Sequence, residues 1–228
     1  MPKLIAIEGL DGSGKGTQSA LLCKSVEMAG RTPVSVSFPD YDSPGAVPVK
    51  MYLGGELGAS PGDTGAYAAS MLFATDRYIS YKTKWEKDAL AEGAVVVANR
   101  YTTANAYHQM AKLPEDMWDT YLTWLWDLEF TKLALPAPDG VIMLSLPTEV
   151  SASLIEKRCV ATGVTKDIHE CDMDYLAACR KAALYVAEKL GWTVISCEDG
   201  NGGILPIDVI HEKVCRVASD ILGFEIPV

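Results

Sequence analysis

Short apolar runs alternate with longer helical patterns along most of the chain. Each run is rich in Val, Ile, Leu and Ala and is bounded by polar or turn-forming residues. Such runs are typical of strands that are buried on both faces, and their alternation with helices predicts an α/β fold. We therefore expect a parallel five-stranded sheet with helices on both faces. The expected strands are residues 4–7, 33–38, 94–98, 140–146 and 193–197.

The stretches between these runs follow the helical period. Gly191 follows one of the longest stretches and suits a left-handed helix cap. Two segments break the rhythm. Residues 41–63 are rich in Gly, Pro and Ser and predict a mobile connection on the substrate side, whereas residues 162–167 form a polar insertion suited to a lid at about 158–170. The expected helices are residues 15–29, 47–53, 64–91, 103–112, 114–132, 148–161, 168–190 and 206–222.

Length and charge narrow the possibilities. A chain of 228 residues suits a single α/β domain over residues 1–228. The formal net charge of −10 argues against sequence-independent binding to nucleic acid, because phosphate backbones require a basic surface. The six cysteines have no metal-binding spacing, and no leader segment or membrane-spanning stretch is evident. These features predict a reduced, cytoplasmic protein that works without a membrane.

The segment that follows the first expected strand is rich in glycine. Glycines let successive backbone N–H groups point inward at an anion, and Lys15 adds a cation where the loop turns into a helix. Strand, loop and helix follow one another as a nucleotide-phosphate site requires, which favours a P-loop NTPase over a simple glycine-rich turn. Gly16 stands where Ser or Thr ordinarily contacts magnesium, so the hydroxyl of Thr17 is the remaining candidate ligand. The expected phosphate-binding residues are Gly9, Gly12, Ser13, Gly14, Lys15, Gly16 and Thr17.

A second segment with candidate chemistry lies in the helix expected at 64–91. Phe73 and Arg77 are four residues apart and therefore project from the same side of that helix. A flat ring can stack on a nucleobase while a guanidinium donates to a carbonyl on its edge. The alternative is a core phenylalanine beside a surface Arg77 that pairs with a carboxylate such as Asp76, and spacing alone does not separate the two interpretations.

Arg100 follows directly after the expected strand at 94–98. In a P-loop fold this strand end faces the transferred phosphoryl group, where an arginine can bind the acceptor phosphate with two hydrogen bonds. The alternative is a structural ion pair. Asn105 and Tyr107 follow in the next helix and offer an amide and a ring with a hydroxyl to a substrate.

Two further groups of residues have an open role. Basic residues near the insertion could neutralise charge on the phosphates when a lid closes, and the candidates are Arg158 and Lys166. Lys157 is explained more simply as a solvated charge at a helix end. The aromatic residues between Trp118 and Trp126 share one expected helix, and core or subunit packing explains them better than a ligand does.

Over nearly its whole length the chain resembles the thymidylate kinases. EGLDGSGKGTQ is similar to the family's EGxDGxGKST-type loop, and LFATDR is similar to its base-reading LFxANR. NRY resembles the family's DRY, DIHE resembles its lid-side DRIE, and the Phe-Pro pair at 38–39 falls at its FPxR stretch. The order and the spacing of these motifs agree with the family pattern.

The resemblance implies ATP-dependent phosphorylation of dTMP to dTDP with Mg²⁺, usually by a homodimer. In the implied roles, Lys15 bridges the donor phosphates, Phe73 stacks on the pyrimidine and Arg77 donates to a base carbonyl. Arg100 is implied to hold the acceptor phosphate, and Asp11 matches an acidic position near the acceptor sugar and the magnesium waters. The resemblance thus implies Lys15, Arg100, Arg158 and Asp11 as catalytic residues, with Phe73, Arg77, Arg100, Asn105 and Tyr107 around the acceptor.

This sequence departs from the family pattern at several positions. Gly16 lacks the magnesium hydroxyl, Asn99 replaces an aspartate, and Tyr41 stands at the arginine of FPxR. Ala104 replaces a frequent serine, and Ile168 replaces the lid arginine. These changes keep two alternatives open, namely a kinase for another nucleoside monophosphate and a nucleotide-binding relative with weak or no transfer.

Overall fold

The structure is a computed structural model that describes residues 2–163 and 167–228, apart from the side chains of Arg158 and Thr162. Its centre is one five-stranded sheet with the strand order β2-β3-β1-β4-β5. Every neighbouring pair is parallel, as predicted, and each strand ends within one residue of its expected position. The strands are β1 (Lys3–Glu8), β2 (Thr32–Ser37), β3 (Ala94–Asn99), β4 (Gly140–Ser145) and β5 (Thr193–Ser196).

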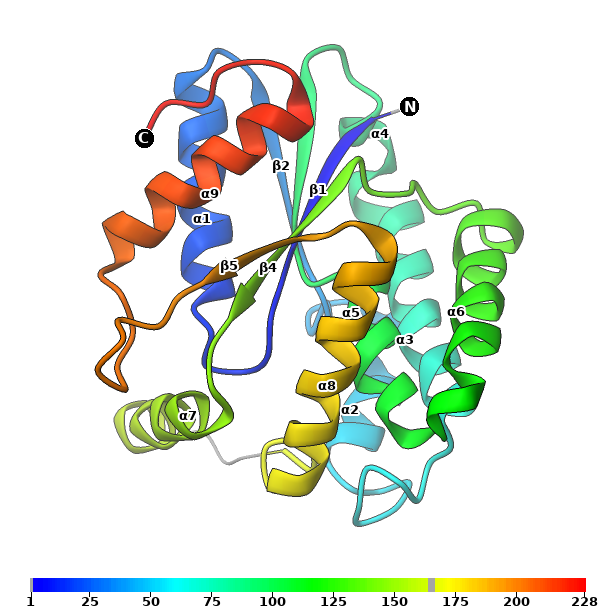
Figure 1. Ribbon diagram of the computed structural model, residues 1–228. Helices are drawn as coiled ribbons and strands as arrows, with labels where there is room; N and C mark the ends of the chain where they lie inside the picture. The colour runs from blue at the N-terminus through cyan, green and yellow to red at the C-terminus, as the bar shows by residue number, and fades with distance from the viewer. Residues whose placement is uncertain (1, 164–166) are drawn as a thin grey trace.

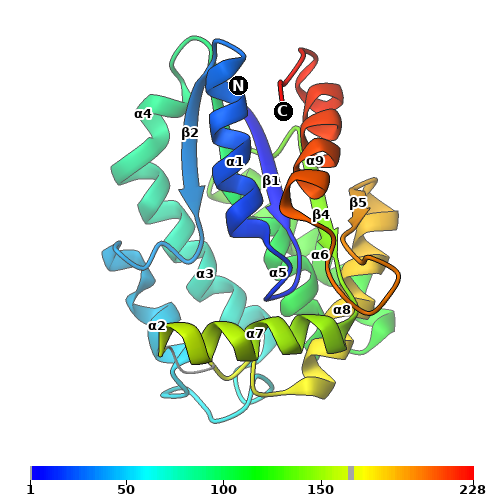
Figure 2. The ribbon, with the colours of Figure 1, turned by 90° about the vertical axis from the view of Figure 1, so that its left-hand side faces the viewer.

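Helices cover both faces of this sheet (Figure 1). Successive side chains of a strand point to opposite faces, so Ile5 and Ile7 pack toward α1 and α9, whereas Leu4 and Ala6 belong to the core on the other face. Figure 2 shows α1 and α9 in front of the sheet, with α3, α5, α6 and α8 behind it. The α-helices are α1 (Lys15–Met28), α2 (Val47–Leu53), α3 (Ala66–Ser80), α4 (Glu86–Ala89), α5 (Thr102–His108), α6 (Trp118–Trp126), α7 (Thr148–Thr162), α8 (Met173–Leu190) and α9 (Ile207–Leu222).

Two long helices of the sequence analysis are interrupted. The stretch expected at 64–91 consists of α3, the π-helical segment η2 (Tyr81–Trp85) and α4, and the stretch at 114–132 ends in a second π-helical segment, η5 (Asp127–Lys132). A π-helical turn is wider than an α-helical turn and shifts which side chains face the core. In η2 it buries both Tyr81 and Trp85, whose ring centroids lie 4.6 Å apart. Short 3-10 turns complete the chain at η1 (Pro44–Ala46), η3 (Met110–Lys112) and η4 (Glu115–Met117).

The helix expected from residue 168 begins later, at Met173. Asp172 caps it, because its side chain accepts a hydrogen bond from the backbone N–H of Tyr175 over 2.9 Å. At its other end the helix stops at Gly191, which adopts the predicted left-handed conformation. Residues 164–166 of the expected lid insertion lie outside the described residues. Figure 2 shows α7 lying across the carboxyl ends of the strands.

The aromatic residues of α6 serve the core, as expected. Trp118 and Tyr121 are buried, and Trp124 packs beside Tyr121 with ring centroids 5.7 Å apart. No helix in the described ranges is long and apolar enough to cross a membrane.

Candidate active site

The glycine-rich loop connects β1 to the first turn of α1. Gly14 is the N-cap of α1 and has a φ of 84°, and Gly12 has a φ of 80°, a region that favours glycine. A Cβ at Gly9 would lie 2.6 Å from the carbonyl oxygen of Leu144, so no side chain fits there. The loop therefore presents backbone N–H groups and the positive end of a helix to an anion.

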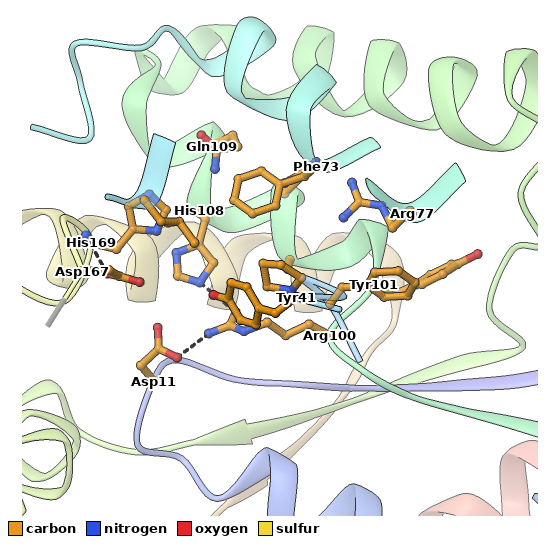
Figure 3. Close-up of a pocket in the computed structure, with 15 residues that line it drawn as sticks. Asp11, Tyr41, Phe73, Arg77, Arg100, Tyr101, His108, Gln109, Asp167 and His169 are labelled. Atoms are coloured by element: carbon orange, nitrogen blue, oxygen red, sulfur yellow. Dashed lines mark hydrogen bonds and ion pairs between the residues drawn. The ribbon is translucent and has the colours of Figure 1, made fainter. Parts of the chain in front are cut away.

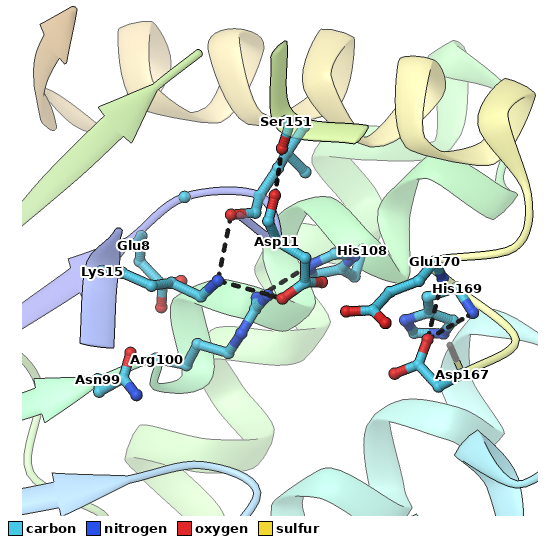
Figure 4. A network of polar contacts seen from close by, with 12 residues as sticks. Glu8, Asp11, Lys15, Asn99, Arg100, His108, Ser151, Asp167, His169 and Glu170 are labelled. Atoms are coloured by element: carbon cyan, nitrogen blue, oxygen red, sulfur yellow. Dashed lines mark hydrogen bonds and ion pairs between the residues drawn. The ribbon is translucent and has the colours of Figure 1, made fainter. Parts of the chain in front are cut away.

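Two cations meet on one oxygen of Asp11 at the end of this loop. Lys15 Nζ lies 3.2 Å from Asp11 Oδ1, and Arg100 Nη2 donates to the same oxygen over 2.7 Å (Figure 4). Burial by itself raises the pKa of Asp11, but the charges of Arg100 and Lys15 outweigh burial and hold that pKa well below its usual range. Burial and the Arg100 charge lower the pKa of Lys15 to about 8. Two positive charges thus share one carboxylate.

Arg100 owes its position to the turn that ends β3. Its backbone has a φ of 65°, in the left-handed region, and its N–H donates to the carbonyl of Ile7 over 3.1 Å. Its Nη1 contacts the hydroxyl of Tyr107 at 3.1 Å and Nε2 of His108 at 2.9 Å. Tyr107 and His108 on one side and Asp11 on the other thereby orient the guanidinium.

Tyr107 has a different place from the one predicted for a substrate-binding residue. It is fully buried, its hydroxyl contacts Glu8 Oε2 at 2.8 Å, and it does not line the pocket described below. Glu8 also accepts hydrogen bonds from the backbone N–H of Tyr101 and from the Thr103 hydroxyl. Burial raises the pKa of Glu8 despite the nearby Arg100 charge. Sequence reasoning missed Glu8, although a carboxylate at the end of an apolar strand was a signal that it needs buried partners.

A pocket opens beyond the carboxyl ends of the strands, where doubly wound sheets bind ligands (Figure 3). Its lining residues surround about 530 Å³ of space outside the protein atoms, part of which is open to solvent. Phe73 and Arg77 line one end, and Asp11 with the Arg100 guanidinium lines the other. Asn105 also lines it, as predicted, and Ala104 lies beside it. His108 lines the pocket too, and the lining residues that the sequence did not suggest for a substrate include Tyr41, Leu53, Gln109, Asp167 and His169.

Arg77 is a pocket residue and an ion-paired residue at once. Its carboxylate partner is Glu129 in η5, and Arg77 Nε donates to Glu129 Oε2 over 2.7 Å while Nη2 donates to Oε1. The suggested partner, Asp76, instead accepts the backbone N–H of Asp40 over 2.9 Å. The surface-pair alternative for Arg77 is therefore wrong, because the side chain is only 2 % exposed.

Several buried polar atoms in this pocket have no hydrogen-bond partner among the described residues. They include both amide atoms of Gln109 and Nδ1 of His108. The imidazole of His108 stacks on that of His169, with ring centroids 5.4 Å apart and planes at 19°. Burial and the Arg100 charge hold the pKa of His108 well below its usual range, so its ring is neutral at pH 7. A buried polar group without a partner is costly, which makes these atoms candidates for contacts with a ligand.

The two positions that depart from the usual magnesium pattern are neighbours. A Cβ on Gly16 would lie 3.8 Å from Nδ2 of Asn99. Asn99 Nδ2 donates to the Ser37 hydroxyl over 3.0 Å, whereas its buried Oδ1 has no partner in the described chain. Thr17 is exposed on the first turn of α1. Within the described ranges no group of three His, Cys, Asp or Glu side chains could hold a metal ion.

The lid side of the site is described in part. Arg158 belongs to α7, but its side chain lies outside the described part of the structure, and Lys166 lies outside the described residues altogether. The segment after the gap closes one wall of the pocket. Ile168 N donates to the carbonyl of Leu53 over 3.3 Å, and His169 Nε2 lies 2.7 Å from the Tyr52 hydroxyl.

A second cavity lies between α7 and the loop that follows β5. Its walls include Val150 and Leu154 of α7 and the backbone around Gly202 and Gly203. Ser151 of α7 donates a hydrogen bond to the backbone carbonyl of Asp11, which joins this region to the glycine-rich loop. A Cβ at Gly12 would lie 3.4 Å from the Cβ of Leu154, so the second cavity lies next to the glycine-rich loop.

Comparisons with known proteins agree with this arrangement. A profile of the thymidylate kinase family matches residues 7–202. The thymidylate kinase of Mycobacterium tuberculosis is 33 % identical over 174 residues, which cover 75 % of this chain and 79 % of that protein. A probable thymidylate kinase of Thermococcus kodakarensis is 33 % identical over 225 residues, covering 97 % and 99 % of the two chains. The solved structure of Candida albicans thymidylate kinase shares the fold, with a TM-score of 0.69, 20 % identity and coverage of 96 % of this chain and 92 % of that one. The chain therefore belongs to the thymidylate kinase family and is a nucleoside monophosphate kinase of the P-loop fold.

Proposed function

We propose that the protein transfers the γ-phosphoryl group of ATP to dTMP and releases dTDP and ADP. The observation that carries this proposal is the polarity of one pocket. Phe73 and Arg77 stand at the end away from the loop, and Arg100 stands beside Lys15 at the other end. A nucleoside monophosphate has the same polarity, with a flat base at one end and a dianion at the other.

In the proposed acceptor complex the thymine stacks on Phe73 and receives a hydrogen bond from Arg77 on a ring carbonyl. Gln109 and Asn105 also line this part of the pocket, and the unpartnered amide of Gln109 offers both a donor and an acceptor to the N3–H and carbonyl edge of the base. The acceptor phosphate binds to Arg100, which then exchanges its contact with Asp11 for a contact with the substrate. Tyr107 acts through Arg100 in this scheme, without touching the substrate.

The transfer requires little covalent chemistry from the protein. An oxygen of the dTMP phosphate attacks the γ-phosphorus of ATP, and the bond from that phosphorus to the β-bridging oxygen breaks, leaving its electron pair on ADP. Lys15 and the N–H groups of Gly12 to Lys15 hold the donor phosphates, while Arg100 holds the attacking phosphate. Orientation and stabilisation of the phosphoryl oxygens account for most of the rate increase in such reactions.

The donor base has a candidate site of its own. We infer that the adenine of ATP occupies the cavity between α7 and the loop after β5, because that cavity lies next to the glycine-rich loop and has apolar walls from Val150 and Leu154. Arg158 and Lys166, at or near the end of α7, are the proposed lid cations. The lid at about 158–170 belongs to a single domain that spans residues 1–228.

Magnesium enters this proposal together with the nucleotide. Gly16 has no hydroxyl and Asn99 no carboxylate, so a magnesium ion would be held here mainly by the nucleotide and by water, with the unpartnered Oδ1 of Asn99 and the carboxylate of Asp11 as the protein groups that would support it. Thr17 is the remaining candidate hydroxyl on this turn. The ion would supply positive charge that neutralises the donor phosphates.

We also propose a cytoplasmic homodimer. None of the six cysteines, all of which lie in the described residues, forms a disulfide, as expected in a reducing compartment. Met71 and Tyr78 of α3 are seven residues apart and therefore share one helix face, where they are 45 % and 39 % exposed. This apolar face supports a contact between two copies better than α6 does, because Trp118 and Tyr121 are used inside the fold. Measuring the molar mass of the Met71→Glu variant by light scattering tests this contact. A variant that is still a dimer would contradict it.

A coupled assay that follows ADP release tests the catalytic proposal. The purified protein is given ATP, Mg²⁺ and, in turn, dTMP, dUMP, dCMP, dGMP and dAMP. We expect the highest kcat/KM with dTMP. Rapid turnover of another monophosphate with negligible turnover of dTMP would contradict the acceptor assignment alone. Binding of ATP without turnover of any monophosphate would contradict the kinase proposal.

A further inference from the structure

Glu129 is a buried carboxylate that the proposed reaction has not used. It lies in the π-helical segment η5, 52 positions after Arg77, and has no exposed surface. Both of its oxygens accept from Arg77, one from Nε and one from Nη2. Oε2 also accepts the hydroxyl hydrogen of Thr102 over 2.6 Å. Since Thr102 opens α5 directly after Arg100 and Tyr101, Glu129 joins Arg77 to the helix that carries Asn105 and is followed by Gln109.

This contact determines which donors of Arg77 remain for a ligand. A guanidinium has five N–H groups in one plane, and the two-point contact with Glu129 fixes that plane. Nε and one hydrogen of Nη2 are used, which leaves Nη1 and the second Nη2 hydrogen. Arg77 lines the pocket beside Phe73 (Figure 3), so these remaining donors are the ones that a base edge in the pocket can meet.

The contact also makes the two pocket arginines electrostatically different. Arg77 has a carboxylate of its own, so that end of the pocket is close to neutral. Arg100 instead shares the carboxylate of Asp11 with Lys15, so it has no carboxylate partner to itself, although Glu8 and Asp167 also lie nearby. A phosphate dianion therefore gains more at Arg100 than at Arg77, and the neutralised guanidinium attracts a ligand mainly by hydrogen bonding.

We propose that Glu129 is a positioning residue for the acceptor, which orients Arg77 toward a carbonyl of the base and cancels its charge so that the phosphate binds only at Arg100. This inference rests on the proposed dTMP kinase function and extends it to specificity. A fixed set of donors favours thymine, which presents a carbonyl at C4, over cytosine, which presents an amino group there. A binding site that presents hydrogen-bond donors disfavours a base that presents another hydrogen-bond donor at the same position.

Steady-state kinetics with dTMP, dCMP and ATP test the inference on four proteins: wild type, Glu129→Gln, Arg77→Met and the double variant. Gln has the shape of Glu but lacks the charge and one acceptor. We expect Glu129→Gln to raise the KM for dTMP by about tenfold and to lower the preference for dTMP over dCMP by about tenfold, with kcat and the KM for ATP within about twofold of wild type. In the Arg77→Met background the same change adds nothing, because Glu129 acts through Arg77.

Two controls keep the outcomes distinct. Asp127→Asn removes an exposed carboxylate from the same π-helical segment and leaves all constants unchanged. Thr102→Val removes only the hydroxyl that supports Glu129 Oε2, and it produces a smaller loss of dTMP affinity in the same direction even if Glu129→Gln does not fold. The inference is overturned if Thr102→Val and folded Glu129→Gln both keep the wild-type affinity for dTMP and the wild-type preference for dTMP over dCMP. It is also overturned if the loss of dTMP affinity caused by Glu129→Gln multiplies with the loss caused by Arg77→Met. A wild-type enzyme that does not phosphorylate dTMP overturns the proposed function instead.

Discussion

Arg100 and Asp11 lie 89 positions apart in the sequence, yet Nη2 of one donates to Oδ1 of the other over 2.7 Å. The same oxygen receives Lys15 Nζ at 3.2 Å, so one carboxylate holds two cations at the junction between the glycine-rich loop and the acceptor pocket. Neither cation has to move far to meet a phosphate, because each already points at a negatively charged oxygen. Asp11 thus holds in place the two side chains that we propose bind phosphates.

The guanidinium of Arg100 has a role that an ammonium group cannot take over. Arg100→Lys loses the planar fork and with it the contacts to Tyr107 and His108. We expect the KM for dTMP to rise about tenfold or more, equivalent to about 1.4 kcal/mol of binding, while the Kd of ATP stays within about twofold. Initial rates and ATP titrations measure both. Arg31→Lys, at an exposed arginine over the Phe224 ring, is the control, and an unchanged KM for dTMP in Arg100→Lys would exclude the assigned role.

The pKa of Lys15 predicts a pH dependence of ATP binding. Burial and Arg100 lower this pKa to about 8, and the phosphates of bound ATP favour the protonated form. Above pH 8 the free protein must take up a proton when ATP binds, so the affinity falls by up to about tenfold per pH unit. Calorimetry at pH 7, 8 and 9, in two buffers with different ionisation enthalpies, measures the affinity and the proton uptake. Equal affinities at pH 7 and 9 would speak against this assignment.

The neighbouring positions Gly16 and Asn99 predict an unusual response to magnesium. A Cβ at Gly16 meets only Asn99 Nδ2, at an ordinary contact distance of 3.8 Å, so Gly16→Ser fits without rearrangement. Its hydroxyl offers a ligand, and Asn99→Asp adds a charge that attracts the ion. We expect each variant to reach half-maximal turnover at a Mg²⁺ concentration several-fold below that of wild type. Magnesium titrations of the initial rate test this, and identical half-saturation in all three proteins would contradict it.

Asp167 predicts a change of stability with pH. Burial, together with the charges of Asp11 and Glu170, raises the pKa of Asp167 from 3.8 to about 6. The folded state therefore binds the proton more tightly, and the stabilisation that this provides is complete below pH 3.8 and is lost as the pH rises through 6. Asp167→Asn retains an oxygen for the N–H groups of His169 and Glu170 and removes the charge.

At pH 8 we expect the free energy of unfolding of Asp167→Asn to be about 1–2 kcal/mol higher than that of the wild type, allowing for partial exposure of the side chain. At pH 4 we expect the two free energies of unfolding to be nearly equal. Urea denaturation at pH 4, 6 and 8 measures the difference. The exposed Asp127→Asn controls for the loss of a negative charge. A difference between Asp167→Asn and wild type that is the same at all three pH values would refute the pKa assignment.

The sequence by itself determined the five strands, the glycine-rich loop and the helix that follows it. These features depend on local properties. In an α/β fold, a short apolar run bounded by polar residues is stable as a strand that is buried on both faces of the sheet. Glycines at positions 12 and 14 permit backbone angles that other residues avoid. For the same reason it was predictable that Phe73 and Arg77 project from one side of a helix, because they are four residues apart, but spacing alone did not show that this side faces a pocket.

Only the tertiary structure decided the partners of these side chains. The π-helical turn of η5 brings Glu129 to Arg77, and packing against Glu8 takes Tyr107 away from the substrate side. The strand order brings Asp11 and Arg100 together, and the docking of the segment from residue 167 onward stacks His169 on His108. Such contacts join residues that are tens of positions apart. They depend on how whole elements pack and on which buried charges must be compensated, and periodicity within one segment carries no information about either.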